Sequence, residues 1–281
     1  MKEKEYTLTA KDGIKLYVRH FSTPQKPEAI LVLIHGFSEH SGRYIHWAKL
    51  FAEKGIEVYA MDYRGHGKAE GLRGHTPSYQ YLLDDIETCI ESIDNKDDLP
   101  VILYGQSLGG NLVINYALSR KHNVSGIIST SPWLKLVTKP KTITVLFARL
   151  LRFIAPKHIK DSKLNINMLS HDPQVVIDYE NDPLTHSFIT PQLFFGGEKA
   201  ARRALKNANE LSTPTLLMHG TGDLITSWKT SKKFAEKAKS AGADITFLSW
   251  PDYYHELHNE INNEAVFDKI MEWINSTIIK N

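Results

Sequence analysis

The first 34 residues contain two kinds of apolar pattern. Residues 6–9 and 14–21 alternate apolar and polar side chains on either side of the turn sequence Lys11-Asp12-Gly13, which predicts an antiparallel hairpin. Residues 29–34, by contrast, are apolar at every position. A short, uniformly apolar run is typical of a strand that is buried on both faces of a parallel sheet.

From residue 29 onward, strand-like runs alternate with segments whose apolar residues recur about every 3.6 positions. The predicted strands are residues 29–34, 56–62, 101–104, 126–131, 215–218 and 246–250. The predicted helices are residues 44–54, 79–93, 108–121, 227–241 and 263–278. This alternation predicts an α/β fold, with a mostly parallel central sheet and helices on both of its faces.

One interval interrupts the alternation. About 80 residues separate the predicted strand that ends near Ser131 from the next, which begins near Thr213, and they hold helical patterns but no strand signal. That length is too great for a connection within a sheet. We therefore predict that residues 133–212 form an inserted helical cap, or lid, on a core formed by residues 1–132 and 213–281.

Within this insertion, one segment has a strongly two-sided pattern. Between Pro140 and Pro156, apolar residues recur at the spacing of one helix face. This apolar stripe consists of Ile143, Leu146, Phe147, Leu150, Leu151 and Ile154. Residues 133–163 also contain eight lysines and arginines against one aspartate, a net charge of +7. The pattern fits a basic lid that contacts an anionic lipid or micelle surface, and equally a helix that packs its stripe on the core.

The composition is that of an ordinary globular protein, with 42% hydrophobic and 23% charged residues. The net charge of +2 is small and no long basic run occurs, so we expect no nucleic-acid partner. The single cysteine, Cys89, excludes an internal disulfide and a cysteine-based zinc site. We expect no metal, no organic cofactor and no protein partner.

The chain begins with charged residues rather than the apolar region of a secretory signal. Its most apolar long segment, residues 143–155, is too short to span a bilayer and contains Arg149 and Arg152. We therefore expect a cytoplasmic protein, with at most a peripheral contact between the cap and a membrane.

The clearest chemical motif is Gly105-Gln106-Ser107-Leu108-Gly109, which follows an apolar strand and opens a helix. A serine on such a sharp turn is exposed for reaction, and the flanking glycines keep β-carbons out of the crowded turn. Ser107 is therefore the candidate nucleophile. The backbone N–H of Leu108, at the start of the helix, points toward any negative charge that forms on a reacting carbonyl oxygen.

A serine hydroxyl needs a neutral imidazole to accept its proton and a carboxylate to orient that imidazole. With this kind of serine turn, the acid and then the histidine follow later in the chain. Asp223 and His255 each follow a predicted parallel strand, so we expect both at the same sheet edge as Ser107. His258 competes for the role of base, but we favour His255 because it comes first after its strand, whereas His258 would lie at the entrance. No acidic residue closely follows the strand that ends near Ser131, which leaves Asp223 as the acid.

A second N–H donor for the carbonyl oxygen is expected from the loop after residues 29–34. Gly36 allows this loop to turn, so that the amide of Phe37 faces that of Leu108. Loss of one such donor typically raises the barrier by about 3 kcal/mol. We interpret His35, in the same loop, as an imidazole that braces it.

Together these residues resemble the monoacylglycerol lipase and lysophospholipase branch of the α/β-hydrolases, sometimes labelled serine aminopeptidase-like. The resemblance covers nearly the whole chain, through residues 35–44, 62–67, 105–109, 181–184, 219–223 and 255–258. It implies an α/β-hydrolase fold, a catalytic triad of Ser107, Asp223 and His255, and oxyanion-hole amides from Phe37 and Leu108.

The same resemblance implies that Glu39, Arg43, Tyr179 and His258 surround a polar pocket for the alcohol part of the substrate. Glu39 and Arg43 could equally form an ion pair that stabilises their loop. Gln106 stands where many relatives carry histidine, so the head-group preference stays open.

We therefore predict a serine hydrolase that cleaves carboxylic esters of single-chain lipids through an acyl-enzyme on Ser107, in the first place a monoacylglycerol lipase. The near alternatives are a lysophospholipase, which the basic lid would favour, and a short-chain carboxylesterase. A peptidase is disfavoured because nothing marks an amine-binding carboxylate pair, and dehalogenases and epoxide hydrolases need a carboxylate where Ser107 stands. A ligand-binding homologue without activity is the remotest alternative.

Overall fold

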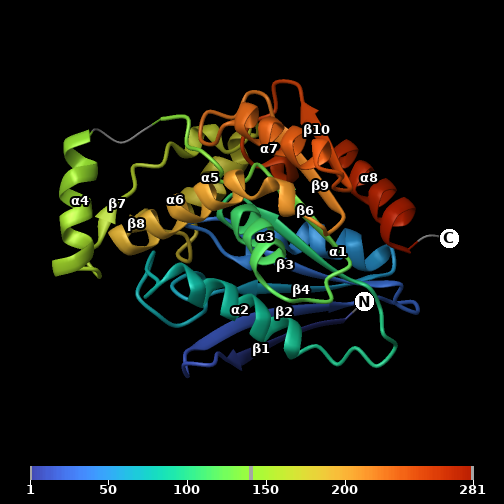
Figure 1. Ribbon diagram of the computed structural model, residues 1–281. Helices are drawn as coiled ribbons and strands as arrows, with labels where there is room; N and C mark the ends of the chain where they lie inside the picture. Colours follow the sequence, from blue (N-terminus) through green and yellow to red (C-terminus); the bar gives the residue numbers. More distant parts are fainter. Residues whose placement is uncertain (1, 139–141, 280–281) are drawn as a thin grey trace.

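The computed structural model describes residues 2–138 and 142–279. Its centre is an eight-stranded sheet in the order β1-β2-β4-β3-β5-β6-β9-β10 (Figure 1). The strands are β1 (Lys2–Thr9), β2 (Lys15–Ser22), β3 (Ala29–Ile34), β4 (Ile56–Asp62), β5 (Val101–Gln106), β6 (Gly126–Thr130), β9 (Thr215–Gly220) and β10 (Ile245–Trp250). The predicted hairpin is confirmed, since β1 and β2 pair antiparallel. Apart from β1 and β2, neighbouring strands run parallel, which confirms the mostly parallel sheet.

Helices cover both faces of this sheet. On one face, α1 (Ile45–Glu53) and α8 (Asn263–Trp273) pack through buried aromatic and aliphatic side chains, Trp47 and Phe267 among them. On the other face lie α2 (Tyr79–Glu91), α3 (Leu108–Ser119) and α7 (Trp228–Ser240). Between these layers every side chain of β3 is buried. This is the environment that a uniformly apolar strand predicts.

The interval 133–212 differs in one respect from the prediction. It contains the helices α4 (Thr142–Ile154), α5 (Pro173–Asn181) and α6 (Pro191–Lys206), and the short 3-10 turns η2 (Ile166–Met168) and η3 (Ala208–Glu210). It also contains two strands, β7 (Lys160–Asp161) and β8 (Phe188–Ile189), which pair antiparallel outside the main sheet. The prediction of an interval without strands is therefore wrong. A strand of two residues is too short to show the alternation on which strand prediction depends.

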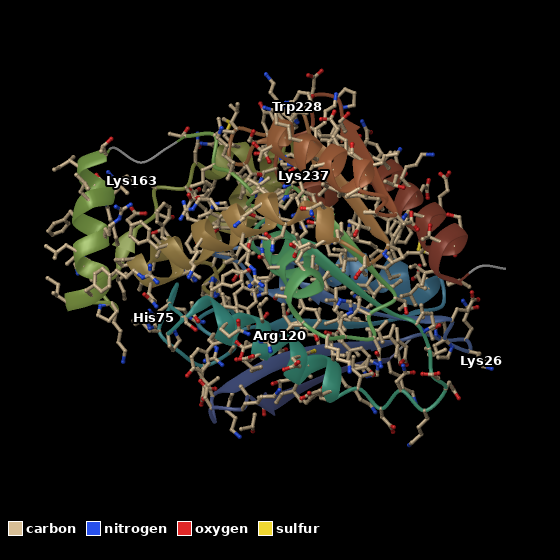
Figure 2. The ribbon with its side chains drawn as sticks, viewed as in Figure 1. Lys26, His75, Arg120, Lys163, Trp228 and Lys237 are labelled. Carbon is tan, nitrogen blue, oxygen red and sulfur yellow. The ribbon has the colours of Figure 1, made fainter. Side chains whose placement is uncertain are left out.

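The apolar stripe of α4 faces away from the rest of the molecule. Ile143 and Ile154 are 72% and 69% exposed, and none of the 13 residues of α4 is buried. Figure 1 shows α4 at the outer edge of the molecule, and Figure 2 shows side chains projecting from it into the surroundings. The alternative that this stripe packs on the core is therefore excluded. Pro140, predicted to precede the stripe, lies outside the described residues, as do the lysines on either side of it.

Helix length and hydropathy within residues 2–138 and 142–279 decide whether a segment could cross a bilayer. None of the helices in these ranges combines the length and the hydropathy that a bilayer crossing requires. The exposed stripe of α4 is thus a surface feature of a helix of 13 residues, which is shorter than the roughly 20 residues of a transmembrane helix.

Candidate active site

Ser107 lies on a sharp turn between the end of β5 and the start of α3. Its φ of 53° and ψ of −110° are values that residues other than glycine rarely adopt. The glycines of the motif are required by close packing, because a β-carbon at Gly105 would overlap the carbonyl group of Gly109, and one at Gly109 would overlap the backbone at the end of β3. Two backbone hydrogen bonds of 2.9 Å hold the turn, from Ser107 N–H to the Thr130 oxygen and from Trp133 N–H to the Ser107 oxygen. The turn therefore holds Ser107 at the carboxyl end of β5.

The loop after β3 lies directly against this turn. A β-carbon at Gly36 would lie 3.2 Å from the β-carbon of Ser107, which is tighter than ordinary contact, so glycine favours this approach. The Gly36 carbonyl oxygen accepts hydrogen bonds from the Tyr63 hydroxyl and from Nδ1 of His35, each at 2.7 Å. The interpretation of His35 as a residue that braces the loop agrees with this contact.

Phe37 and Leu108 approach Ser107 from these two segments. Within the part of the chain that the structure describes, neither backbone N–H donates a hydrogen bond to a protein acceptor. Leu108 is buried and Phe37 is half-buried. Because buried backbone N–H groups are nearly always paired, the unpaired N–H of Leu108 beside a candidate nucleophile is notable. An oxyanion hole requires N–H donors without a protein acceptor, and the role of these two in such a hole stays a prediction.

Contacts from the interval 133–212 fix the conformation of the same loop. Ser38 has a φ of 70°, and its carbonyl oxygen accepts hydrogen bonds from the Tyr179 hydroxyl at 3.0 Å and from the His186 N–H at 3.2 Å. In addition, Nε2 of His40 lies 2.8 Å from a carboxylate oxygen of Asp182. Because a serine in the left-handed region is strained, these contacts stabilise a loop that would otherwise relax.

Asp223, in the loop after β9, is buried and fully hydrogen-bonded. Its Oδ1 accepts from the backbone N–H groups of Ile225 and Thr226, at 2.7 and 2.9 Å. Its Oδ2 accepts from the Thr226 hydroxyl at 2.8 Å and lies 2.9 Å from Nε2 of His219 and 2.7 Å from Nδ1 of His255. Burial alone would raise the pKa of Asp223, but the charge of His255 and the hydrogen bonds from both histidines lower it well below its ordinary value. Asp223 is therefore ionised at neutral pH.

His255 carries the properties of a general base. The contact with Asp223 places the proton of the neutral ring on Nδ1 and leaves Nε2 as the acceptor. Burial lowers the pKa of His255, but the charge and the hydrogen bond of Asp223 outweigh burial and raise this pKa above its ordinary value of 6.5. The competent neutral form of His255 therefore dominates only above that raised pKa.

Ser107 and His255 line one cavity of about 250 Å³. Much of its wall is apolar, with side chains from Leu136, Val145, Ala148, Leu164, Leu169, Ile189, Phe194 and Ile225. The polar part, near the serine, includes Glu39, Gln106, Tyr179 and Glu256. Further polar side chains line the cavity from other segments, and these are Thr138, Thr144, Lys160, Asp161, Ser162, Thr190 and Thr226. The polar part adjoins the nucleophile, because Gly36 lies against Glu39, Gln106 and Ser107 together. The cavity thus offers an apolar space for a chain and polar groups beside the reacting serine.

Two buried glutamates at the polar part of the cavity share one half-buried arginine. Arg43 donates to Glu39 at 2.8 Å and, with both terminal nitrogens, to Glu256 at 2.6 and 2.7 Å. Glu39 also accepts from Gly36 N–H at 2.6 Å and from the Tyr44 hydroxyl at 2.8 Å. Burial raises the pKa of Glu39 to about 7. The negative charge of Glu256 adds to this rise, and the positive charge of Arg43 opposes it. Burial also opposes ionisation of Glu256, but Arg43 lowers the pKa of Glu256 to about 2. The ion pair considered for Glu39 and Arg43 therefore forms, and Glu39 also faces the cavity.

The four residues predicted around the alcohol pocket do not all reach the cavity. Glu39 and Tyr179 belong to the described residues that line it, whereas Arg43 and His258 do not. The expectation that His258 lies at the entrance is wrong. The turn η4 (Leu257–Asn259) directs His258 inward, where its ring is fully buried and stacks on Tyr44 with centroids 4.3 Å apart. Tyr179 places its ring beside Arg43, whose guanidinium carbon lies 4.9 Å from the ring centroid.

Sequence reasoning missed three residues of the site. His219 and Thr226 both contact the Asp223 carboxylate, and Glu256 both lines the cavity and binds Arg43. His219 is the penultimate residue of the buried strand β9 and lies four positions before Asp223. Thr226 follows Asp223 by three positions, a spacing at which an Asp side chain closes a turn on the backbone that follows it. The spacing of His219 and Thr226 from Asp223 could therefore have indicated that both contact its carboxylate. Glu256 carried no signal beyond its place next to His255.

Comparisons with known proteins identify the family. A family model described as serine aminopeptidase, S33 (Hydrolase_4) matches residues 25–262. The chain is 29% identical over 276 residues to a monoacylglycerol lipase of Mycolicibacterium smegmatis, with 96% of each chain covered. It is 36% identical over 272 residues to an uncharacterized abhydrolase domain-containing protein of Dictyostelium discoideum, a match that covers 96% of this chain and 29% of that protein.

A solved structure extends the comparison to three dimensions. The crystal structure of Paleococcus ferrophilus monoacylglycerol lipase matches with a TM-score of 0.84 and 35% sequence identity, over 93% of this chain and 99% of that chain. The fold is therefore that of the α/β-hydrolases. The chain belongs to the serine aminopeptidase S33 family of these enzymes and is a serine hydrolase of its monoglyceride-lipase-like group.

Proposed function

We propose that this protein hydrolyses the ester bond of monoacylglycerols, with Ser107 as nucleophile, His255 as base and Asp223 as the group that orients the base. The observation that carries the proposal is the 2.7 Å contact between buried Asp223 and His255, because His255 lines the same cavity as the strained Ser107. Two similar proteins, from Mycolicibacterium smegmatis and Paleococcus ferrophilus, are named monoacylglycerol lipases, which supports the substrate class.

The proposed reaction has two halves. Nε2 of His255 accepts the Ser107 proton while the serine oxygen attacks the ester carbonyl carbon, and the carbonyl oxygen becomes negative between the N–H groups of Phe37 and Leu108. When the bond to the alcohol breaks, His255 gives its proton to the departing glycerol oxygen. A water molecule then attacks the acyl group on Ser107 in the same way, which releases the fatty acid and restores the serine. Asp223 stabilises the imidazolium in both halves.

The charges at the polar part of the cavity favour a neutral alcohol over a phosphate head group. Glu39 and Glu256 both line this part, and the single guanidinium of Arg43 contacts them from outside it. Glycerol hydroxyls can donate hydrogen bonds to the oxygens of both glutamates. A phosphodiester would be repelled by Glu256, whose pKa of about 2 keeps it ionised, and by Glu39 when the pH exceeds its pKa of about 7. This arrangement supports a monoacylglycerol rather than the lysophospholipid that the basic lid favours.

We also propose that α4 rests on a lipid surface while substrate enters. Its outer face exposes Leu146, Phe147 and Leu150 by 54 to 59%, while Thr144 and Ala148, on its inner side, line the cavity. An exposed apolar helix face of this kind marks an interaction surface, and basic residues beside it fit an anionic lipid interface. The α4 helix would then form part of the path from lipid to Ser107. The cytoplasmic location expected from the sequence stays a prediction.

A substrate panel tests the proposal. We expect kcat/KM for a medium-chain monoacylglycerol to exceed that for the lysophospholipid of the same acyl chain at least tenfold, because the phosphate would meet Glu39 and Glu256. A p-nitrophenyl ester of the same chain should also be cleaved, and an aminoacyl amide should not. Each substrate is measured below its critical micelle concentration, so that surface binding by α4 does not enter the comparison.

The panel also separates the alternatives. A preference for the lysophospholipid would contradict the charge argument and support a lysophospholipase. A preference for two- to four-carbon esters over longer ones would indicate a short-chain carboxylesterase. Absence of turnover on every ester, with an intact fold by circular dichroism, would indicate a ligand-binding homologue.

A further inference from the structure

A second hollow, of about 240 Å³, lies on the side of α6 opposite the active-site cavity. The first turn of α2, the end of α4 and the middle of α6 form its walls, and it shares no lining residue with the cavity at Ser107. On α6, Pro191 and Phe194 face that cavity, whereas Gln192 and Lys199 face the hollow. The hollow is therefore a separate feature of the surface.

Positive charge converges on this hollow without compensation. Arg152, Lys199 and Arg203 line it, and none of the described residues in its wall is acidic. The neighbouring Arg202, which lies outside it, has Glu198 at 3.5 Å. No comparable carboxylate partner within 4 Å is found for the three lining cations in the ranges 2–138 and 142–279. Three like charges facing one space repel each other, so an anion bound there would lower the electrostatic energy.

The polar groups of the hollow are arranged before any ligand binds. Nε of Arg152 donates to the side-chain oxygen of Gln192 at 2.9 Å, and the Gln192 nitrogen donates to the Pro77 oxygen at 2.6 Å. This chain of contacts fixes the guanidinium of Arg152 and leaves its two terminal nitrogens to bind a ligand in a bidentate manner. Ser78, at the start of α2, makes no capping hydrogen bond with its side chain, so its hydroxyl is a further donor.

We propose that this surface, the basic hollow, binds a phosphate group. Two guanidinium groups and one ammonium group match the charge and the several oxygens of a phosphate better than a single carboxylate. Two sources of that group fit the position. A phospholipid head group is one, because Arg152 belongs to α4, where Phe153 and Ile154 are 78% and 69% exposed. A free phosphate compound is the other.

The test compares two charge-reversed variants of the full chain. Lys199→Glu with Arg203→Glu reverses two of the three positive charges that line the basic hollow. Lys233→Glu with Lys239→Glu changes the net charge equally on the exposed side of α7, outside it. Binding of inorganic phosphate is measured by titration calorimetry at constant ionic strength set with chloride. We expect the dissociation constant to rise at least tenfold in the first variant and less than twofold in the second, with equal thermal unfolding midpoints.

A second arm distinguishes the sources. Both variants are sedimented with phosphatidylcholine vesicles that contain phosphatidate. A tenfold loss of vesicle binding confined to the hollow variant assigns the site to lipid phosphate. Equal vesicle binding, together with the specific loss of inorganic phosphate binding, assigns it to a free phosphate compound. The proposal is overturned if the unmodified protein binds phosphate no better than chloride, or if both variants lose phosphate binding equally. Neither readout depends on ester hydrolysis, so the hydrolase proposal can fail without affecting this test.

Discussion

The surroundings of Asp223 and the outer face of α4 are built in opposite ways. Both oxygens of Asp223 are satisfied by protein donors, and His219, His255 and Thr226 around it are all buried. The α4 helix has no buried residue among its 13 positions and presents an apolar stripe to solvent. One region thus holds charges and hydrogen bonds in a fixed arrangement, while the other holds an apolar surface without a protein partner.

This difference indicates which part of the function each region serves. Acyl transfer needs an acceptor, an acid and two N–H donors within tenths of an ångström of their working positions, and only a buried, fully bonded network supplies that precision. Capture of a lipid needs an apolar surface that is free until a lipid covers it. If this division is correct, substitutions in the first region should change the reaction on every ester, and those in the second should change it only at a lipid surface.

The largest expected effect comes from removing the nucleophile. Ser107→Ala should lower kcat for a soluble ester at least about 10⁴-fold and abolish labelling by a fluorophosphonate probe, because only background stabilisation by the site remains. Sedimentation with vesicles should be unchanged, since α4 is untouched. Ser119→Ala, at the far end of the same helix, is the matched control and should retain activity. Substantial turnover by Ser107→Ala would exclude the acyl-enzyme mechanism.

Asp223→Asn should have the next largest effect and should also move the pH profile. In the unmodified protein, His255 must be neutral, and Asp223 raises the pKa of His255 above 6.5. Activity should therefore be lost as the pH falls through a midpoint above about 6.5. With asparagine, the charge that raises the pKa of His255 is gone, and burial lowers that pKa. The acidic side of the pH–activity profile should therefore shift to lower pH, while kcat falls about 10³- to 10⁴-fold. The measurement is log(kcat/KM) as a function of pH. If the midpoint of the acidic side is the same in both proteins, a group other than His255 sets that midpoint.

The contact between Asp223 and His255 was predictable from sequence because parallel strands end at one edge of a sheet. Strands β9 and β10 pair in parallel, with Gly220 opposite Trp250, so the loops that follow them leave the sheet side by side. The same rule places Ser107 after β5. No knowledge of side-chain packing is needed for this step.

The rest depended on contacts that a linear pattern does not encode. His258 is a histidine like His255 and lies only three positions after it, so the sequence does not distinguish the two by type. The turn η4 is what directs His258 into the core. The apolar stripe of α4 was equally compatible with burial and exposure, because periodicity shows which side chains share a face but not what that face meets. Similarly, the hydrogen bond from Tyr179 to Ser38 joins residues that are 141 positions apart.

A variant of α4 tests the second half of the comparison. Leu146→Ser with Leu150→Ser removes two exposed apolar side chains and should lower hydrolysis of monoacylglycerol in anionic vesicles about tenfold, roughly the 1.4 kcal/mol expected when two partly immersed side chains are lost. Hydrolysis of a soluble ester should change less than twofold. Ile261→Ser, which removes an apolar side chain that is 67% exposed but lies outside α4, is the control. Equal losses on vesicles and on the soluble ester would refute the proposed lipid contact.

The smallest effect tests whether the interval 133–212 also supports the fixed chemistry of the core, since Tyr179 of α5 contacts the loop that contains Phe37. Its hydroxyl donates to the Ser38 oxygen at 3.0 Å, and Tyr179→Phe removes this bond, worth about 1 kcal/mol. If the hydroxyl holds the Phe37 N–H in place, kcat should fall about fivefold while KM stays constant, because the donor acts mainly in the transition state. Tyr81→Phe is a matched control, since the Tyr81 hydroxyl has no hydrogen-bond partner among the described residues. A rise in KM with kcat unchanged would instead show that the Tyr179 hydroxyl binds the substrate alcohol directly.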